Sequence, residues 1–177
     1  MESSFDIDRM VSDIMNQDIE RAVATYFREN NLTLSFAESC TGGYLSHVIT
    51  SLAGSSTYFK GGLVAYDNDV KHRILHVPHK ILMKDGAVSE ACVHSMAKHG
   101  RALFQTDYAM AVSGIAGPGG ASPEKPVGTV WIGLASEKEI RTRCFYFGNK
   151  DRKWIIRKTA LEALCLLLDF VKSTINK

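Results

Sequence analysis

Small and hydroxyl-bearing residues follow three apolar runs of the chain, in the segments "AESCTGG" (37–43), "SGIAGPGG" (113–120) and "FGNKDR" (147–152). Each segment lies where a predicted strand ends. In open α/β sheets, ligands bind where strand ends meet helix starts, because backbone N–H groups there can approach an anion. The pattern therefore predicts a site for a small anionic ligand, such as a phosphate, built from several loops.

The first of these loops has the residues of a helix start. Thr41 occupies the predicted cap position, and Gly42 and Gly43 open the helix, which favours a cradle of N–H groups for an anion. An ordinary strand-to-helix turn, in which glycine supplies a positive φ, explains the same residues and is the commoner case for such a turn taken alone. No lysine follows the glycines as in a Walker motif, and residues 114–120 lack the dinucleotide-binding spacing.

A second group of residues has the types needed for nucleophilic catalysis. Ser55 and Ser56 precede Tyr66 and Lys71. A lysine can act as a base toward a serine if burial lowers its pKa from about 10.4 toward neutrality, and a tyrosine hydroxyl can relay or anchor a proton. A surface lysine near two turn serines is the alternative, and spacing alone favours it.

Histidines and a cysteine raise two further hypotheses. His72, His76 and His79 are close in sequence, but no carboxylate stands at a helical offset and Pro78 interrupts the helix, so we expect no metal site. Cys40 precedes a predicted helix, where a thiolate would be stabilised. With no partner histidine identifiable, a buried thiol without a catalytic role is an equally good interpretation.

The periodicity of apolar residues predicts the elements that position these groups. Helices are expected in the first 30 residues, at 44–54, at 89–104 and after Asp151. Strands are expected at 32–37, 56–66, 107–114, 127–136 and 139–148. Helices and strands alternate first, and a hairpin around Glu137 and Lys138 follows. This order predicts a three-layer α/β/α sandwich with a mixed sheet.

The composition indicates one domain, expected over residues 1–177 with a helical segment at 1–30. Of the 177 residues, 45% are hydrophobic and 23% are charged. The net charge of +2 is spread along the chain, which disfavours nucleic-acid binding. The four cysteines form no CxxC pair, and we find neither a signal peptide nor an apolar run long enough for a membrane span. A cytoplasmic protein without membrane contact is expected.

Five ordered motifs at matching separations connect these segments to a known family. They are "AESCTGG", "GSSTYFKGGLVAYDNDVKHRIL", "SGIAGPGG", "EKPVGTVWIGLA" and "FGNKDRKWIIRKTAL", with the short "GAVSE" among them. From about residue 32 to its end, the chain closely resembles the CinA C-terminal domain family, the nicotinamide-nucleotide amidases.

The resemblance implies that the carboxamide of nicotinamide mononucleotide is hydrolysed to nicotinate mononucleotide and ammonia, a step of the pyridine nucleotide cycle. It implies a serine-type mechanism without metal or cofactor. It further implies a mixed, mainly parallel five-stranded sheet in the α/β/α sandwich, and a homo-oligomer such as a dimer. In two-domain members this unit follows a molybdopterin-binding-like domain, which is missing from this sequence, so the stand-alone form is expected.

Carried over position by position, the family's site falls on Ser39, Thr41, Ser56, Tyr66, Lys71, Ser113 and Arg152. We expect Lys71 to be the base and Tyr66 to position or relay the proton. The nucleophile is Ser56 or Ser39. If the loop at 41–43 holds one end of the ligand, a serine from another loop faces the amide more easily. Ser56 is therefore favoured, with Ser39 as a second hydroxyl or oxyanion donor.

The remaining site residues are expected to bind the nucleotide. Ser113, with Gly114, and Arg152 suit ribose and phosphate, since a guanidinium can grip a phosphate through two hydrogen bonds. Glu38 has no assigned role. The segment 113–120 has Gly119 where the family commonly has an acidic residue. A catalytically silent nucleotide-binding or interaction protein on the same fold is the alternative function, and an amidase for another small amide is a third.

Overall fold

The structure, a computed structural model, describes the backbone of residues 7–175 and the side chains from residue 18 onward. Residues 1–6 of the predicted N-terminal helical segment lie outside the described residues. The elements are α1 (Ile7–Glu29), β1 (Leu34–Glu38), α2 (Tyr44–Thr50), the 3₁₀ turn η1 (Ser55–Thr57), β2 (Phe59–Val64), α3 (Asn68–Arg73), α4 (His79–Lys84), α5 (Glu90–Phe104), β3 (Tyr108–Gly114), β4 (Thr129–Ala135), β5 (Ile140–Tyr146) and α6 (Arg152–Ile175).

The sheet has five strands in the order β2-β1-β3-β4-β5. Strand β1 pairs in parallel with β2 and β3, whereas β3–β4 and β4–β5 are antiparallel. The mixed five-stranded sheet is thus confirmed. Four strands share one direction and β4 alone opposes them, although the pairings divide evenly between parallel and antiparallel.

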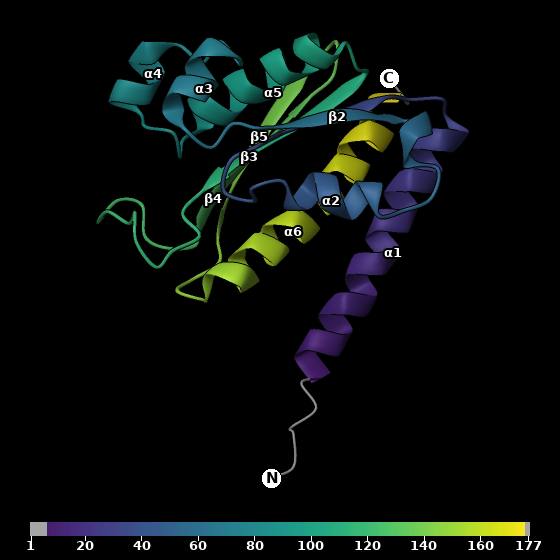
Figure 1. The fold of residues 1–177 in the computed structure, drawn as a ribbon, viewed down its shortest axis with the longest axis horizontal. Coiled ribbons are helices and arrows are strands. Elements are labelled where there is room, and N and C mark those ends of the chain that lie inside the picture. Colours follow the sequence, from purple (N-terminus) through teal and green to yellow (C-terminus); the bar gives the residue numbers. More distant parts are fainter. Residues whose placement is uncertain (1–6, 176–177) are drawn as a thin grey trace.

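Helices cover both faces of the sheet, which confirms the three-layer α/β/α sandwich (Figure 1). Helices α1, α2 and α6 pack together on one face, and α3, α4 and α5 lie on the other. The larger apolar core lies under the first layer and a smaller one under the second. Strand β3 is buried along nearly its whole length because helices cover both of its faces, as its continuous apolar run predicts.

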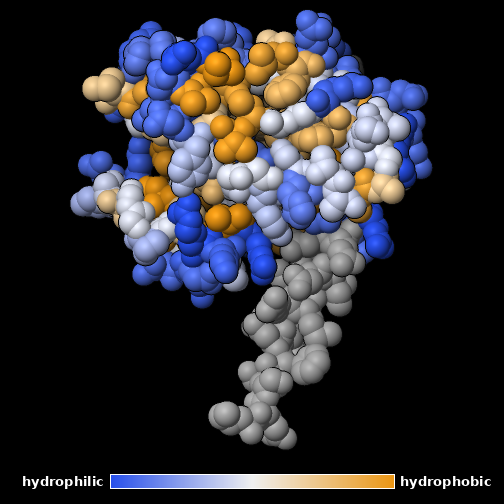
Figure 2. Space-filling model, in the orientation of Figure 1, coloured by the Kyte–Doolittle hydropathy of each residue, from blue (hydrophilic) through white to orange (hydrophobic). Residues whose placement is uncertain are grey.

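The molecular surface mixes polar and apolar residues (Figure 2). Apolar side chains gather over the layer of α3, α4 and α5, where Ile74, Met83 and Leu103 are exposed. Within the part of the chain that the structure describes, no helix is long and apolar enough to cross a membrane.

Local side-chain contacts set the element ends. Ser89 caps α5 by accepting a hydrogen bond from the Cys92 N–H at 3.3 Å, and Asp151 caps α6 through the N–H groups of Lys153 and Trp154. The strand expected at 56–66 begins only at Phe59, because its first residues form the 3₁₀ turn η1. Ser56 therefore lies in this turn, before β2.

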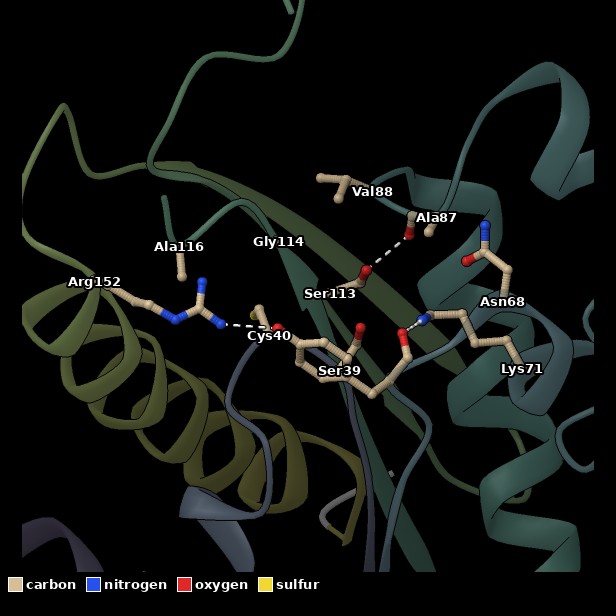
Figure 3. Close-up of a pocket in the computed structure, with 11 residues that line it drawn as sticks. Ser39, Cys40, Asn68, Lys71, Ala87, Val88, Ser113, Gly114, Ala116 and Arg152 are labelled. Carbon is tan, nitrogen blue, oxygen red and sulfur yellow. Dashed lines mark hydrogen bonds between the residues drawn. The ribbon is translucent and has the colours of Figure 1, made fainter. Parts of the chain in front are cut away.

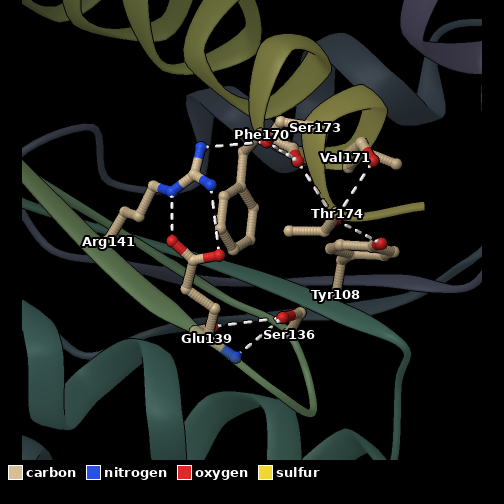
Figure 4. A network of polar contacts seen from close by, with 8 residues as sticks. All are labelled: Tyr108, Ser136, Glu139, Arg141, Phe170, Val171, Ser173 and Thr174. Atoms are coloured by element: carbon tan, nitrogen blue, oxygen red, sulfur yellow. Dashed lines mark hydrogen bonds and ion pairs between the residues drawn. The ribbon is translucent and has the colours of Figure 1, made fainter. Parts of the chain in front are cut away.

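Polar contacts attach the end of α6 to the sheet (Figure 4). The hydroxyls of Tyr108, at the start of β3, and Thr174 lie 2.7 Å apart. Arg141 of β5 donates to the Ser173 hydroxyl at 2.9 Å, pairs with Glu139, and stacks 4.9 Å from the centre of the Phe170 ring. The β4–β5 hairpin and the last helix are therefore fixed to each other.

Candidate active site

A pocket opens at the carboxyl ends of β1 and β3, the edge of the sheet that the loop pattern indicates. Side chains from both helical layers reach it (Figure 3). Its lining consists of Ser39, Cys40, Tyr66, Asn68, Lys71, Ala87, Val88, Ser113, Gly114, Ala116 and Arg152. The pocket thus combines two basic side chains and several hydroxyls with no acidic side chain.

Lys71 is a buried amine on α3, with only 1% of its surface exposed. Its Nζ donates to the carbonyl of Ala65 at 2.8 Å and to that of Tyr66 at 2.9 Å. Among the described residues it forms no ion pair with a carboxylate. Burial therefore lowers the pKa of Lys71 below its ordinary value of 10.5. The surface lysine that spacing alone favours is not what the structure shows.

The two carbonyl contacts of Lys71 are compatible with the neutral amine that a general base requires. A neutral amine has two N–H bonds and one lone pair, and the two carbonyls accept both N–H bonds. The lone pair is then left for a proton from another group. Figure 3 shows the Lys71 amine and the Ser39 hydroxyl at the same side of the pocket.

Ser39 is the residue directly after β1. Its backbone N–H donates to the Val112 carbonyl at 3.0 Å, which extends the pairing with β3 by one residue. Its side chain lies in the pocket beside those of Lys71 and Ser113 (Figure 3). The structure thus brings together Ser39 and Lys71, the hydroxyl and base types that amide hydrolysis needs.

Ser56 does not lie in this pocket. It is an exposed residue of η1, before β2, whereas Ser39 follows β1. Leu34 pairs with Phe59 and Glu38 with Val64, so the start of β2 lies beside the start of β1. The strand length places about 13 Å between the two ends. Within one chain, Ser56 therefore lies at the opposite end of the strands from Lys71. Its role as nucleophile stays a prediction, and the pocket favours Ser39 as the partner of Lys71.

The expected anion cradle at 41–43 is occupied by the chain's own Glu38. The Glu38 Oε2 accepts from the Thr41 hydroxyl at 2.7 Å and from the N–H groups of Gly43 and Leu45 at 3.0 and 3.1 Å. Its Oε1 accepts from the N–H and hydroxyl of Ser46. The carboxylate is fully buried and accepts hydrogen bonds from N–H groups at the start of α2, which have no partner within the helix. Thr41, Gly42 and Gly43 thus shape this turn and lie outside the pocket lining.

Arg152 and Tyr66 meet across the pocket. The Arg152 Nη2 donates to the Tyr66 hydroxyl at 2.8 Å, and its Nη1 donates to the Gly117 carbonyl at 2.8 Å. Arg152 is the first residue of α6, so the helix cap at Asp151 fixes where its side chain starts. The Tyr66 hydroxyl therefore contacts a guanidinium, while only its backbone carbonyl contacts Lys71.

Ser113 and Gly114, the last two residues of β3, both line the pocket. The Ser113 hydroxyl donates to the Ala87 carbonyl at 2.8 Å, which connects β3 to the segment before α5 that also lines the pocket. A Cβ at Gly114 would lie 2.7 Å from Val130 Cγ2 and 2.9 Å from the Thr129 carbonyl oxygen, so β4 leaves no room for a larger residue. Gly119 lies outside the lining, and a Cβ there would meet nothing within 4 Å.

Asn68, Ala87 and Val88 line the pocket although their residue types indicate no role in the sequence. Asn68 lies three residues before Lys71 on α3, a helical offset that places two side chains on one face. Ala87 and Val88 belong to the "GAVSE" motif, whose residues carry no obvious chemistry. For Cys40, burial raises the pKa of the thiol to about 12, which keeps it protonated. The interpretation of Cys40 as a buried thiol without a catalytic role is therefore favoured.

The histidines after Lys71 form ring contacts. The His72 and His79 rings lie 3.7 Å apart between centroids, and His72 Nδ1 lies 2.9 Å from the Val77 carbonyl oxygen. In the described part of the chain, no group of three or more histidine, cysteine, aspartate or glutamate side chains could hold a metal ion.

Comparison with known proteins gives a family match over most of the chain. The model of the CinA C-terminal domain family matches residues 16–171. A CinA-like protein of Cytophaga hutchinsonii is 46% identical over 149 residues, which cover 84% of this chain and 35% of the relative. A CinA-like protein of Thermosipho melanesiensis is 47% identical over 157 residues, or 86% and 38% of the two chains. The chain thus spans little more than a third of these curated relatives.

Solved structures match over nearly their whole length. The competence/damage inducible protein CihA of Agrobacterium tumefaciens has a TM-score of 0.86 at 36% identity, covering 88% of this chain and 94% of that one. The competence damage-inducible protein A of Klebsiella pneumoniae has a TM-score of 0.85 at 32% identity, covering 89% and 97%.

Proposed function

This chain belongs to the CinA C-terminal domain family, and we propose that it hydrolyses the carboxamide of nicotinamide mononucleotide to nicotinate mononucleotide and ammonia. One observation carries the proposal. A lysine whose pKa burial lowers, with both N–H bonds of its neutral form accepted by carbonyls, shares a pocket with a serine hydroxyl. This pairing matches the needs of amide hydrolysis without a metal.

In the first step Ser39 attacks the amide. The neutral Lys71 accepts the hydroxyl proton as the Ser39 oxygen bonds to the carbonyl carbon, giving a tetrahedral intermediate. The N–H groups of Cys40 and Thr41, which follow the serine in the turn before α2, are the proposed donors to the oxyanion. Lys71 then returns the proton to the departing nitrogen, so that ammonia leaves and a Ser39 ester of nicotinate mononucleotide remains.

In the second step water replaces ammonia. Lys71, neutral again, takes a proton from a water molecule that attacks the ester carbonyl. The second tetrahedral intermediate collapses and the proton passes from Lys71 to the Ser39 oxygen. Nicotinate mononucleotide leaves, and serine and lysine return to their starting states. Atoms and charges therefore balance with water as the only co-substrate.

The pocket's charge suits a nucleotide substrate. None of its lining residues is acidic, and Arg152 provides a permanent positive charge at the end opposite Asn68 (Figure 3). A phosphate at Arg152 would leave the pyridine ring to reach toward Ser39 and Lys71. Ser113, between the two ends, has a hydroxyl in position for the ribose.

Ammonia release from nicotinamide mononucleotide tests this function. The purified protein is expected to release one ammonia per nicotinate mononucleotide formed, and Lys71→Met is expected to release none above background. Binding of the nucleotide without ammonia release would identify the silent nucleotide-binding alternative. Release from other small carboxamides, with the nucleotide inert, would identify an amidase of another specificity.

The homo-oligomeric assembly stays a prediction. Sedimentation of the full chain at several concentrations would check it, and a dimer is the expected species. A single monomeric species at all concentrations would contradict it, whereas the proposed steps use only Ser39 and Lys71 of one pocket and would still be possible.

A further inference from the structure

The bridge between Tyr66 and Arg152 joins two distant parts of the chain over the pocket. Tyr66 precedes α3, which carries Lys71, and Arg152 starts α6 on the other helical layer. Both residues line the pocket, and the Arg152 Nη2 donates to the Tyr66 hydroxyl. The hydrogen bond of 2.8 Å between them therefore spans the space a substrate would enter.

The guanidinium is held but its charge is not neutralised. Both of its contacts, the Tyr66 hydroxyl and the Gly117 carbonyl, are neutral acceptors. The ion pairs found between residues 18 and 175 do not include Arg152. Two of its five N–H bonds are used, which leaves the others for a ligand. Such an arrangement fits an anion better than a neutral group.

The Tyr66 hydroxyl has its hydrogen bond with Arg152 and not with Lys71. The residue contacts Lys71 through its backbone carbonyl, at 2.9 Å, and a change of side chain leaves that carbonyl in place. Tyr66 is 60% exposed. While it accepts from Arg152, the phenol keeps its own O–H, which can donate to the same anion.

We propose that Tyr66 is a positioning residue, whose hydroxyl orients Arg152 to bind the phosphate of a nucleoside monophosphate and does not carry the proton between Ser39 and Lys71. The inference rests on the proposed function for the identity of the anion. It assigns the Tyr66 hydroxyl to substrate binding and to discrimination against the dephosphorylated nucleoside.

A double-mutant cycle tests this assignment. Calorimetry gives the Kd of nicotinamide mononucleotide for the wild type, Tyr66→Phe, Arg152→Met and the double variant, and ammonia release gives kcat. Because a hydrogen bond to a charged group is lost, Tyr66→Phe should raise Kd about tenfold with kcat within about twofold. In the Arg152→Met background the same change should alter Kd by less than about twofold, since Tyr66 acts through Arg152.

The dephosphorylated ligand and a second tyrosine supply the controls. Tyr66→Phe should leave the Kd of nicotinamide riboside unchanged, because that ligand has no phosphate. Tyr146 is 64% exposed and lies on β5 outside the pocket. Tyr146→Phe should change neither the Kd of nicotinamide mononucleotide nor kcat. Melting temperatures of all variants should agree with that of the wild type, since both tyrosine side chains are exposed.

A different pattern would overturn the proposal. A kcat lowered a hundredfold or more by Tyr66→Phe, with an altered pH profile and unchanged Kd, would make the hydroxyl a proton carrier. Equal Kd penalties in both backgrounds would show that Tyr66 does not act through Arg152. Failure of the proposed function is distinguishable, because the binding cycle can give the expected pattern while the wild type releases no ammonia. A wild type that binds no nucleotide overturns both.

Discussion

The protonation of Lys71 is the residue-level feature on which the proposed chemistry depends. Burial lowers its pKa below 10.5, and only the neutral amine can accept the Ser39 proton. We expect kcat/KM for ammonia release to rise with pH through an apparent pKa below the ordinary lysine value. Lys71→Arg should lower kcat/KM by about 10³ at all pH values, because a guanidinium does not deprotonate in proteins. A rate that falls over the same pH range would contradict Lys71 as the base.

The same pKa links folding to pH. Because the folded protein binds the Lys71 proton more weakly than the unfolded chain, the free energy of unfolding falls as pH falls from 10.5 through the lowered pKa. Denaturant titration at several pH values would measure the free energy of unfolding of the wild type and of Lys71→Met. The value for the wild type, relative to that of Lys71→Met, should fall as pH falls over this interval. A difference that is independent of pH across this interval would show that the folded and unfolded pKa values are equal.

Ser39 and Ser56 allow a matched test of which serine is the nucleophile. Ser39→Ala removes the hydroxyl beside Lys71 and should lower kcat by about 10³ or more, as expected for a residue that acts as a unit with its base. Ser56→Ala removes an exposed hydroxyl at the other edge of the sheet and should leave kcat within about twofold. Ammonia release measured side by side decides between them. An inactive Ser56→Ala beside an active Ser39→Ala would mean that the site takes Ser56 from another copy of the chain.

These residues also show what the sequence could predict. The residue types and the loops were predictable, because strand-to-helix loops follow from apolar periodicity and glycine. Which serine shares a pocket with Lys71 was not predictable, because spacing along the chain does not show which side chains the fold brings together. The burial of Lys71 depends on how α3 packs on the sheet, and spacing along the chain contains no such information.

At the level of elements, Glu38 is the residue that joins β1 to α2. Its two oxygens accept from three N–H groups and two hydroxyls around the start of the helix. The sequence left Glu38 without a role because a carboxylate before the turn can cap a helix only if strand and helix meet at the angle that packing provides. The anion predicted for this loop is thus present as a side chain of the chain itself.

Glu38→Gln tests that role with little change of volume. The amide would turn an NH₂ group toward donors that need an acceptor, and the free energy of unfolding should fall by about 3 kcal/mol. Thermal and denaturant unfolding would measure the loss. Glu90→Gln is the control, since Glu90 lies on the surface and accepts only from the Thr142 hydroxyl, and it should cost less than about 1 kcal/mol. Equal losses in both variants would contradict the capping role.

At the level of the whole molecule, an aromatic chain ties the first helix to the sheet and to the last helix. Phe27 of α1 contacts Tyr58 and Tyr108 with ring centroids 6.0 and 5.9 Å apart, and Tyr108 continues the series to Phe170 of α6 at 5.9 Å. Tyr108 starts β3, so this cluster lies at the edge of the sheet opposite the pocket. The aromatic cluster and the pocket of the proposed chemistry therefore lie at opposite ends of the parallel strands.

Phe27→Ala tests this division. Phe27 is fully buried, and its loss should lower the free energy of unfolding by about 3–5 kcal/mol through a cavity between α1, β3 and η1. Because the pocket lies at the other ends of β1 and β3, the KM of the folded fraction should stay within about twofold of the wild type. Tyr26→Ala, at a partly buried neighbour on α1, should cost clearly less stability. A KM raised together with the loss of stability would show that the two ends of the sheet are coupled, since packing at one end would then set the geometry at the other.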